Sequence, residues 1–266
     1  MAFLSVFPRR PVVSVLQLEG IIQPGGRVRT TGLSDATLAP MIEKAFRKGK
    51  PAAVALKINS PGGSPVQSSL ISARIRRLAD ERNIPVYAFV EDLAASGGYW
   101  IASAADEIYV DPNSILGSIG VIYASFGFHE LLKRSGIERR VHTAGTDKSL
   151  LDPFLPENPD HVERLKGIQE QMHAEFIDHV RTRRGERLNG DSLFTGRFWT
   201  GRTAVELGLA DGIGHLVPKL KELHGRKVRF RHYNRRRQLL GSVGIRFADS
   251  LLDALEDRFI WARFGQ

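Results

Sequence analysis

The chain has 266 residues, of which 42% are hydrophobic and 25% are charged, and its formal net charge is +9. This composition is that of an ordinary globular protein long enough to bury a sizeable core. No run reaches the roughly eighteen apolar residues that span a bilayer, and the lack of cysteine excludes disulfides, thiol catalysis and thiolate metal sites.

The charge is unevenly distributed along the chain. Residues 218–240 hold nine Lys or Arg against one acid, whereas residues 1–217 are nearly neutral. We therefore predict a main domain over 1–217 and a basic C-terminal segment over 218–266. The N-terminal stretch MAFLSVFPRRPVVSV has its charges after its apolar residues, the reverse of a signal peptide, which predicts a cytoplasmic protein.

Strand and helix signals alternate along the main domain with short connections. This alternation predicts an α/β fold with a mostly parallel sheet. The tail after Gly244 has apolar residues at helical spacing, which predicts an amphipathic helix. The predicted strands are 12–18, 52–58, 85–90, 107–110, 119–124 and 137–143, and the predicted helices are 35–47, 65–79, 127–135, 157–185 and one that begins at Ser96.

Two glycine-rich loops, NSPGGS at 59–64 and AASGGY at 94–99, each lie between a predicted buried strand and a predicted helix. Ligands bind at the carboxyl ends of parallel strands, and a helix that begins at Ser96 directs its free amides to that space. Acyl transfer needs such donors for its oxyanion. We predict Ser96 as a nucleophile with the Gly63 and Gly97 amides as donors. Gly62 is a near-equal alternative to Gly63, and a serine that only caps the helix is the structural alternative.

A serine hydroxyl needs a base to become a strong nucleophile. Among the eight histidines only His142 is placed near the loops, and no HxxxH or HExxH spacing indicates a zinc site. Lys148, in the polar loop HTAGTDKSLLDPF, is the other candidate base. A loop lysine is usually a solvated charge, and it accepts a proton only where desolvation makes its amine neutral. Ser118, in LGSIGV, is a hydroxyl that can orient this amine.

Four segments resemble the bacterial signal peptide peptidase A family of serine proteases, and they follow in unbroken order from about Val12 to Leu216. They are INSPGGS, AASGGYWIASAADEIYVDPNSILGSIGVI, GTDKSLLDPF and FTGRFWTGRTAVELGLADGIG. The resemblance implies Ser96 as the nucleophile, Lys148 as the general base and Ser118 as the hydrogen-bond partner of the lysine. It implies an oxyanion donor in the Pro-Gly-Gly loop, a crotonase-like fold shared with the Clp proteolytic subunit, and ring- or dome-shaped homo-oligomers.

The expected function is therefore that of a serine endopeptidase with a Ser-Lys dyad and no metal or other cofactor. Its expected substrates are signal-peptide remnants, other peptides or unfolded protein. Many family members carry an N-terminal membrane anchor that we do not find in this sequence, so soluble substrates fit equally well. Residues 219–264 are expected either to contact the inner face of the cell membrane or to pack within the oligomer.

Two other functions are compatible with parts of the sequence. A crotonase-type acyl-CoA hydratase or isomerase would use an oxyanion hole with carboxylates, for which Glu91 and Asp92 are the nearest candidates. A non-catalytic module would bind membrane or nucleic acid through the basic residues of 219–237. The second leaves the glycine loops unexplained, so no nucleic acid partner is expected. Tyr99 and Trp100 are candidates either for the substrate pocket or for the core.

Overall fold

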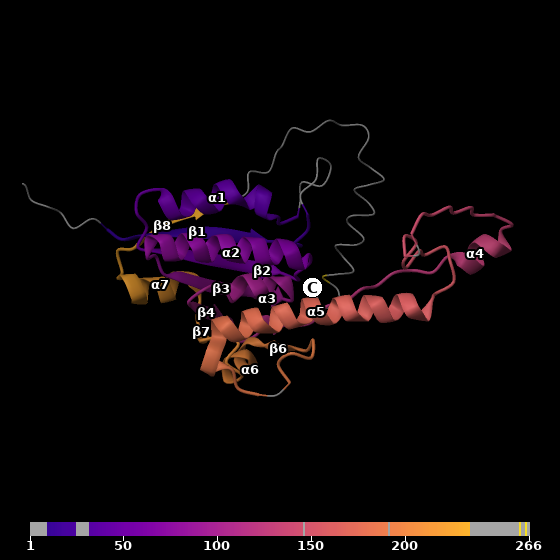
Figure 1. The fold of residues 1–266 in the computed structure, drawn as a ribbon. Coiled ribbons are helices and arrows are strands. Elements are labelled where there is room, and N and C mark those ends of the chain that lie inside the picture. Colours follow the sequence, from indigo (N-terminus) through magenta and orange to yellow (C-terminus); the bar gives the residue numbers. More distant parts are fainter. Residues whose placement is uncertain are drawn as a thin grey trace, which may run out of the picture.

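The computed structural model describes residues 10–24, 32–145, 147–190, 192–234, 261 and 264. In this part of the chain, one sheet has the strand order β6-β5-β3-β2-β1-β8, with β4 beside β3 and β7 beside β4 (Figure 1). All strand pairs are parallel except β5 with β6. The predicted α/β class with a mostly parallel sheet is confirmed. The strands are β1 (Val12–Glu19), β2 (Ala53–Ser60), β3 (Val86–Ala95), β4 (Glu107–Val110), β5 (Ile115–Gly117), β6 (Phe198–Thr200), β7 (Gly212–Ile213) and β8 (Arg229–Tyr233).

The five predicted helices are present, with ends within three residues of those predicted, and the short helices over 201–206 and 216–224 are additional. Ser34 caps the first helix with a capping box, and Gly185, at φ 55°, ends the long one. The α-helices are α1 (Asp35–Arg47), α2 (Pro65–Arg82), α3 (Gly97–Ala102), α4 (His129–Arg134), α5 (Pro159–Arg184), α6 (Gly201–Glu206) and α7 (Leu216–His224).

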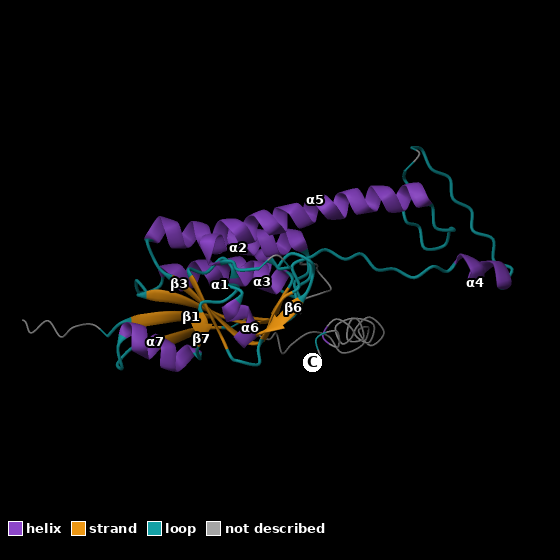
Figure 2. Cartoon of the chain, turned by 90° about the horizontal axis from the view of Figure 1, so that it is seen from below, coloured by secondary structure: helices purple, strands orange, loops and turns teal. Residues whose placement is uncertain are grey.

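Alternating side chains give the sheet two buried faces. Leu16 of β1 points to the face that α1, α2, α3 and α5 cover, where the larger core lies. Val13 and Val15 point to the opposite face, where Leu220 of α7 covers them. Figure 2 shows these helices on one side of the strands and α7 on the other. The sheet is thus enclosed on both faces and open to ligands mainly at its ends.

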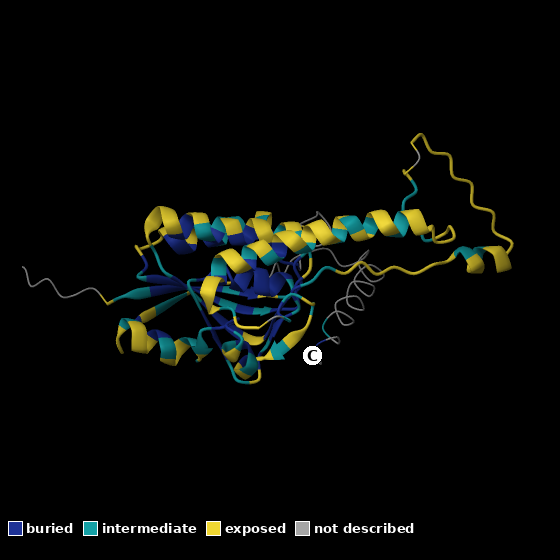
Figure 3. Ribbon diagram, turned by 60° about the horizontal axis from the view of Figure 1, so that its bottom comes forward, coloured by how far each residue is buried: buried dark blue, intermediate teal, exposed yellow. Residues whose placement is uncertain are grey.

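The strands predicted over 119–124 and 137–143 are wrong. Residues 120–158 are called the arm here; in its described parts, 120–145 and 147–158, it carries α4 and otherwise forms only loops and turns. The arm projects away from the sheet together with the N-terminal half of α5, and most of it is exposed (Figures 1 and 3). An apolar run becomes a strand only beside a pairing partner, and the arm has none within the described part of the chain. Its exposed apolar side chains include Ile122, Phe126, Phe128, Leu131, Ile137 and Phe154.

The beginning of the basic segment is built into the sheet. Strand β8 pairs in parallel with β1, from Val12 opposite Arg229 to Leu16 opposite Tyr233. The predicted boundary at residue 218, where a separate C-terminal segment would begin, stays a prediction. The helix predicted after Gly244 lies outside the described residues, apart from two positions near its end. Within the described ranges, the helices are too short or too polar to cross a lipid bilayer.

Candidate active site

Ser96 lies at the carboxyl end of β3, where the chain turns into α3. Its φ of 51° is in the left-handed region, which is uncommon for a residue other than glycine. Its amide donates to the Gly117 carbonyl at 2.8 Å, and its carbonyl accepts from the Trp100 amide at 3.0 Å. The side chain makes no capping hydrogen bond to α3. The hydroxyl therefore does not serve as a helix cap, and the strained strand-to-helix turn is of the kind that presents a nucleophile.

The two glycine loops, more than thirty positions apart in the sequence, touch each other at this turn. A Cβ on Gly62 would lie 2.7 Å from the Gly97 nitrogen and 2.8 Å from the Ser96 Cβ. A Cβ on Gly97 would lie 3.4 Å from the Gly63 nitrogen and 2.3 Å from the Ser68 Oγ. Contacts this close leave no room for a side chain, which explains why both loops need glycine.

The Gly63 and Gly97 amides differ from the Gly62 amide in their hydrogen bonding. The Ile22 amide donates to the Gly62 carbonyl, and the Ser64 amide donates to the Ile22 carbonyl, each at 2.7 Å. In such a parallel bridge the N–H of the residue between them, Gly63, points the other way. Within the described chain neither the Gly63 nor the Gly97 amide donates to an acceptor. The Gly62 amide, by contrast, already donates to Ser60 Oγ at 3.2 Å.

Replacing Gly63 by alanine is expected to destabilise this loop, because the new Cβ would lie 1.9 Å from the Ile22 carbonyl oxygen. Gly20→Ala is the matched control: Gly20 also has a positive φ, of 111°, but nothing lies within 4 Å of its Cβ position. The conformational cost alone is about 1 kcal/mol. We expect Gly63→Ala to lower the free energy of unfolding by at least about 2 kcal/mol more than the control, in urea titrations. Equal losses would show that the loop moves freely away from Ile22.

Ser118 directly follows β5, as Ser96 directly follows the neighbouring strand β3. Ala95 of β3 is paired with Gly117 of β5, so the two serines follow at matching positions of parallel strands. Neighbouring strands lie about 4.8 Å apart. Ser118 also has a positive φ, 54°, and its amide donates to the Arg197 carbonyl at 2.6 Å. The fold therefore brings Ser96, Ser118 and the two amides together at the carboxyl ends of β3 and β5.

Lys148 is not part of this cluster in a single chain. It is exposed, in a turn of the arm where its amide donates to the Gly145 carbonyl at 3.4 Å. His142 is exposed on the same arm. Figure 1 shows the arm beyond the far end of α5, away from the sheet. Folding of one chain thus assembles the predicted nucleophile and donors and leaves both candidate bases outside.

The carboxylates of the alternative function have other partners. Glu91 pairs with Lys57 at 2.9 Å, and Asp92 accepts a hydrogen bond from Asn59 at 2.7 Å. Both belong to the lining of a cavity of about 430 Å³ that also includes Asp111 and His215. Ser96 is not among the residues of this cavity. The position of these carboxylates gives no support to an acid-base pair acting beside the glycine amides.

Tyr99 and Trp100 are core residues. The Tyr99 side chain is fully buried and its hydroxyl donates to the Leu209 carbonyl at 2.9 Å, and burial raises its pKa. Trp100 stacks on Phe176 of α5, with ring centroids 4.7 Å apart. These contacts hold α3, and with it Ser96, against the long helix.

His179 of α5, which sequence reasoning did not single out, adds to this anchor. Its ring stacks on Trp100 at 5.0 Å, and its Nε2 lies 3.0 Å from Ser103 Oγ and 3.2 Å from the Trp100 carbonyl oxygen. Desolvation by burial lowers the pKa of His179 to about 4. The fold therefore favours the neutral imidazole, which packs against α3. Its place on a mixed helix face offered no sequence signal for this role.

The pKa shift of His179 predicts a pH-dependent stability. In the unfolded chain the pKa returns to about 6.5, so between pH 6.5 and 4 the unfolded state binds the extra proton. The stability is fully present above pH 6.5 and is lost as the pH falls towards 4, by about 3 kcal/mol at most. His179→Phe keeps the ring stacking and removes the titration. We expect a flatter profile of unfolding free energy between pH 4 and 7 for this variant than for wild type; parallel profiles would contradict the assignment.

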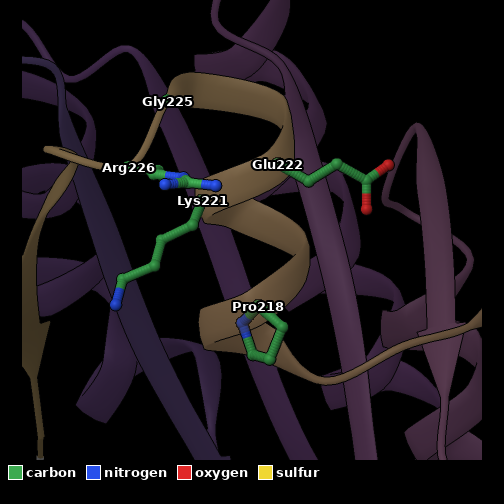
Figure 4. Close-up of a pocket in the computed structure, with 5 residues that line it drawn as sticks. All are labelled: Pro218, Lys221, Glu222, Gly225 and Arg226. Atoms are coloured by element: carbon green, nitrogen blue, oxygen red, sulfur yellow. The ribbon is translucent and has the colours of Figure 1, made fainter.

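A second hollow lies around α7, far along the sheet from the glycine loops. Its volume is about 630 Å³, and in Figure 4 Lys221 and Arg226 point to one side of the helix while Glu222 points to the other.

Among the described residues, no three His, Asp or Glu side chains gather in a way that could hold a metal ion.

Comparison with known proteins places the chain in a family. A model of peptidase family S49 matches residues 79–227, a range that includes Ser96, Ser118 and Lys148. The chain is 32% identical to protease 4 of Haemophilus influenzae over 76% of its own length, and 32% identical to the chloroplastic serine protease SPPA of Arabidopsis thaliana over 74%. It is 49% identical, over 95% of its length, to a protein of Brucella melitensis named Na(+)/H(+) antiporter NhaA.

Together, these similarities place the chain in a class of proteins described as peptidases. The chain belongs to peptidase family S49, which includes signal peptide peptidase A. It spans only part of its relatives: 37% of the Brucella protein, 32% of the Haemophilus protein and 30% of the Arabidopsis protein.

Proposed function

We propose that the chain is an endopeptidase whose nucleophile is Ser96. The observation that supports this most is the meeting of the strained Ser96 turn with two unpaired glycine amides from separate loops. Ser96 Oγ attacks the peptide carbonyl carbon, and the C=O electron pair moves to the oxygen. The Gly63 and Gly97 amides then donate to this oxyanion, which is the main electrostatic contribution to such a reaction.

The general base in this proposal is Lys148, supplied by a neighbouring subunit. An exposed lysine on a projecting arm cannot take the Ser96 proton within its own chain, but the apolar side chains of the arm suit burial against a second copy. Burial of the amine in such an interface favours its neutral form. Ser118, beside Ser96, orients the incoming amine. The assembly is a homo-oligomer closed by repeated contacts of this type.

The reaction has two halves. Lys148 takes the Ser96 hydroxyl proton as the C–O bond forms, and returns it to the leaving amine as the peptide C–N bond breaks. A water molecule then gives its proton to the same lysine, attacks the acyl-enzyme, and releases the acid as Ser96 recovers its proton. No step requires a metal or another cofactor.

The finer points of this function are also proposals. The α/β sheet is compatible with a crotonase-like arrangement, and relatives named as signal peptide peptidases favour peptide remnants, or unfolded protein, as substrates. The basic side of α7 and the segment 219–264 suit a peripheral contact with anionic lipid on the cytoplasmic side.

The name of the Brucella relative describes a protein of which this chain matches 37%, so we assign no transport activity to this chain.

The test is covalent labelling of the full chain with a fluorophosphonate serine-hydrolase probe, followed by peptide mapping. The proposal predicts that the label is on Ser96, and that peptides of unfolded casein accumulate in the absence of metal. A crotonase-type hydratase would leave Ser96 unlabelled and would hydrate an enoyl-CoA instead. Labelling confined to another serine would refute the assignment.

A further inference from the structure

The hydroxyl of Ser60, the last residue of β2, connects the Pro-Gly-Gly loop to the end of β1. Its Oγ donates to the Gly20 carbonyl at 2.7 Å and accepts from the Gly62 amide at 3.2 Å. Ser60 is 1% exposed, whereas Gly63 is exposed. The Ser60 side chain therefore holds, from inside the protein, the residue immediately before a proposed oxyanion donor.

Ser60 also contacts the helix that carries the other proposed donor. A Cβ on Gly98 of α3 would lie 2.6 Å from the Ser60 carbonyl oxygen and 3.2 Å from the Ser60 Cβ. Gly98 directly follows Gly97. A contact this close shows that the backbone of α3 packs directly on the end of β2. Ser60 thus touches both donor-bearing elements, one through its hydroxyl and the other through its backbone.

The Pro-Gly-Gly loop depends on outside contacts for its conformation. Gly62 and Gly63 have positive φ values of 98° and 138°, and two successive glycines form the least restrained kind of backbone. The Gly62 carbonyl accepts from the Ile22 amide at 2.7 Å. In a trans peptide unit the carbonyl and the next N–H point in opposite directions, so this bond directs the Gly63 N–H away from Ile22. Backbone rotation at Gly62 is therefore restrained on both sides, by Ser60 at its N–H and by Ile22 at its carbonyl.

We propose that Ser60 is a positioning residue of the oxyanion hole, whose hydroxyl orients the Gly63 amide by holding Gly62. This inference rests on the proposed peptidase function and deepens it, because it names a residue that acts through the donors without touching the substrate. Loss of the hydroxyl leaves the buried Gly62 amide and the Gly20 carbonyl without this partner, which favours other loop conformations. Because oxyanion donors act mainly in the transition state, the loss falls on kcat.

The test compares Ser60→Ala with Ser14→Ala in the full chain. Ser14 is a matched control: it is a fully buried strand serine, on β1, whose Oγ donates to the Ala45 carbonyl at 2.8 Å. Rates are measured on a fluorogenic peptide, and stability by urea titration. We expect Ser60→Ala to lower kcat by about tenfold or more with KM within about twofold of wild type. We expect Ser14→Ala to lose stability but to keep kcat within about twofold.

A transition-state analogue gives a second measurement, on folded sites only. A peptide aldehyde adds the Ser96 hydroxyl across its carbonyl, and the resulting hemiacetal oxygen takes the place of the oxyanion. The corresponding peptide alcohol binds without this addition. The ratio of the aldehyde to the alcohol inhibition constant should rise about tenfold in Ser60→Ala and stay unchanged in Ser14→Ala. Ser60→Cys has nearly the same size and weaker hydrogen bonds, so it should give a smaller change in the same direction.

The outcomes separate this inference from the proposed function. If wild type is labelled at Ser96 and cleaves the peptide, but kcat and the inhibitor ratio of Ser60→Ala stay within about twofold of wild type, the inference is wrong. A loss confined to KM or to stability, or an equal loss of kcat in Ser14→Ala, would make Ser60 a structural residue only. If wild type neither labels at Ser96 nor cleaves peptides, the proposed function itself fails, and this inference with it.

Discussion

Ser96→Ala is expected to reduce peptide hydrolysis by at least about 10³-fold, because no other group forms the acyl-enzyme. The variant should melt within a degree or two of wild type, since the hydroxyl makes no capping bond to α3. Initial rates on a fluorogenic peptide and a thermal melt measure the two quantities. Ser72→Ala, which changes a buried serine in the middle of α2, is the control and should keep near wild-type activity.

A loss of activity together with a loss of folding would leave Ser96→Ala uninformative by itself. Probe labelling of the remaining folded fraction separates the two effects, because a folded variant without the nucleophile stays unlabelled. Activity within tenfold of wild type in a well-folded Ser96→Ala protein would end the assignment.

Lys148→Ala is expected to lower hydrolysis by a similar factor, since the hydroxyl then lacks its base. Lys133→Ala removes another exposed lysine of the same arm, on α4, and is expected to leave the rate nearly unchanged. The pair of variants separates a specific role of Lys148 from a general effect of the positive charge of the arm. Equal rates for both variants would exclude Lys148 as the base.

Mixing the two inactive variants tests where the base comes from. If each site combines Ser96 of one subunit with Lys148 of its neighbour, Ser96→Ala and Lys148→Ala subunits complement each other. Random mixed assemblies of equal amounts should then recover about a quarter of the wild-type rate, because one neighbouring pair in four carries both intact groups. No recovery after dissociation and reassembly, with mixed oligomers demonstrated by mass, would place both groups in one chain.

Much of the fold follows from local signals in the sequence. The buried strands β1, β2, β3 and β4 are short apolar runs, and α1, α2 and α5 begin and end at residues that cap helices. These signals are local because they depend on side-chain spacing and on backbone groups within one turn of helix. The resemblance to the family and the prediction of Ser96 as nucleophile also depend on local signals, the short motifs around the glycine loops.

Tertiary structure decided what depends on partners far away in the chain. Among the described residues, the apolar runs at 119–124 and 137–143 have no strand beside them, and all of these residues except the buried Ile119 are part of the arm. The bridge to Ile22 leaves the Gly63 amide without an acceptor among the described residues, whereas the Gly62 amide donates to Ser60, and this difference favours Gly63 as the proposed donor.

The sequence by itself therefore determined the class of sheet and the family, and it predicted Ser96 as the nucleophile beside the two glycine loops. Only the tertiary structure could show that His179 of α5 packs against α3, and that Phe264 lies beside Ala95. It also showed that Lys148 stays outside the site of its own chain. The physical reason is that spacing along a chain specifies which residues share a face, whereas contacts between distant segments are specified by packing and by which surfaces remain uncovered.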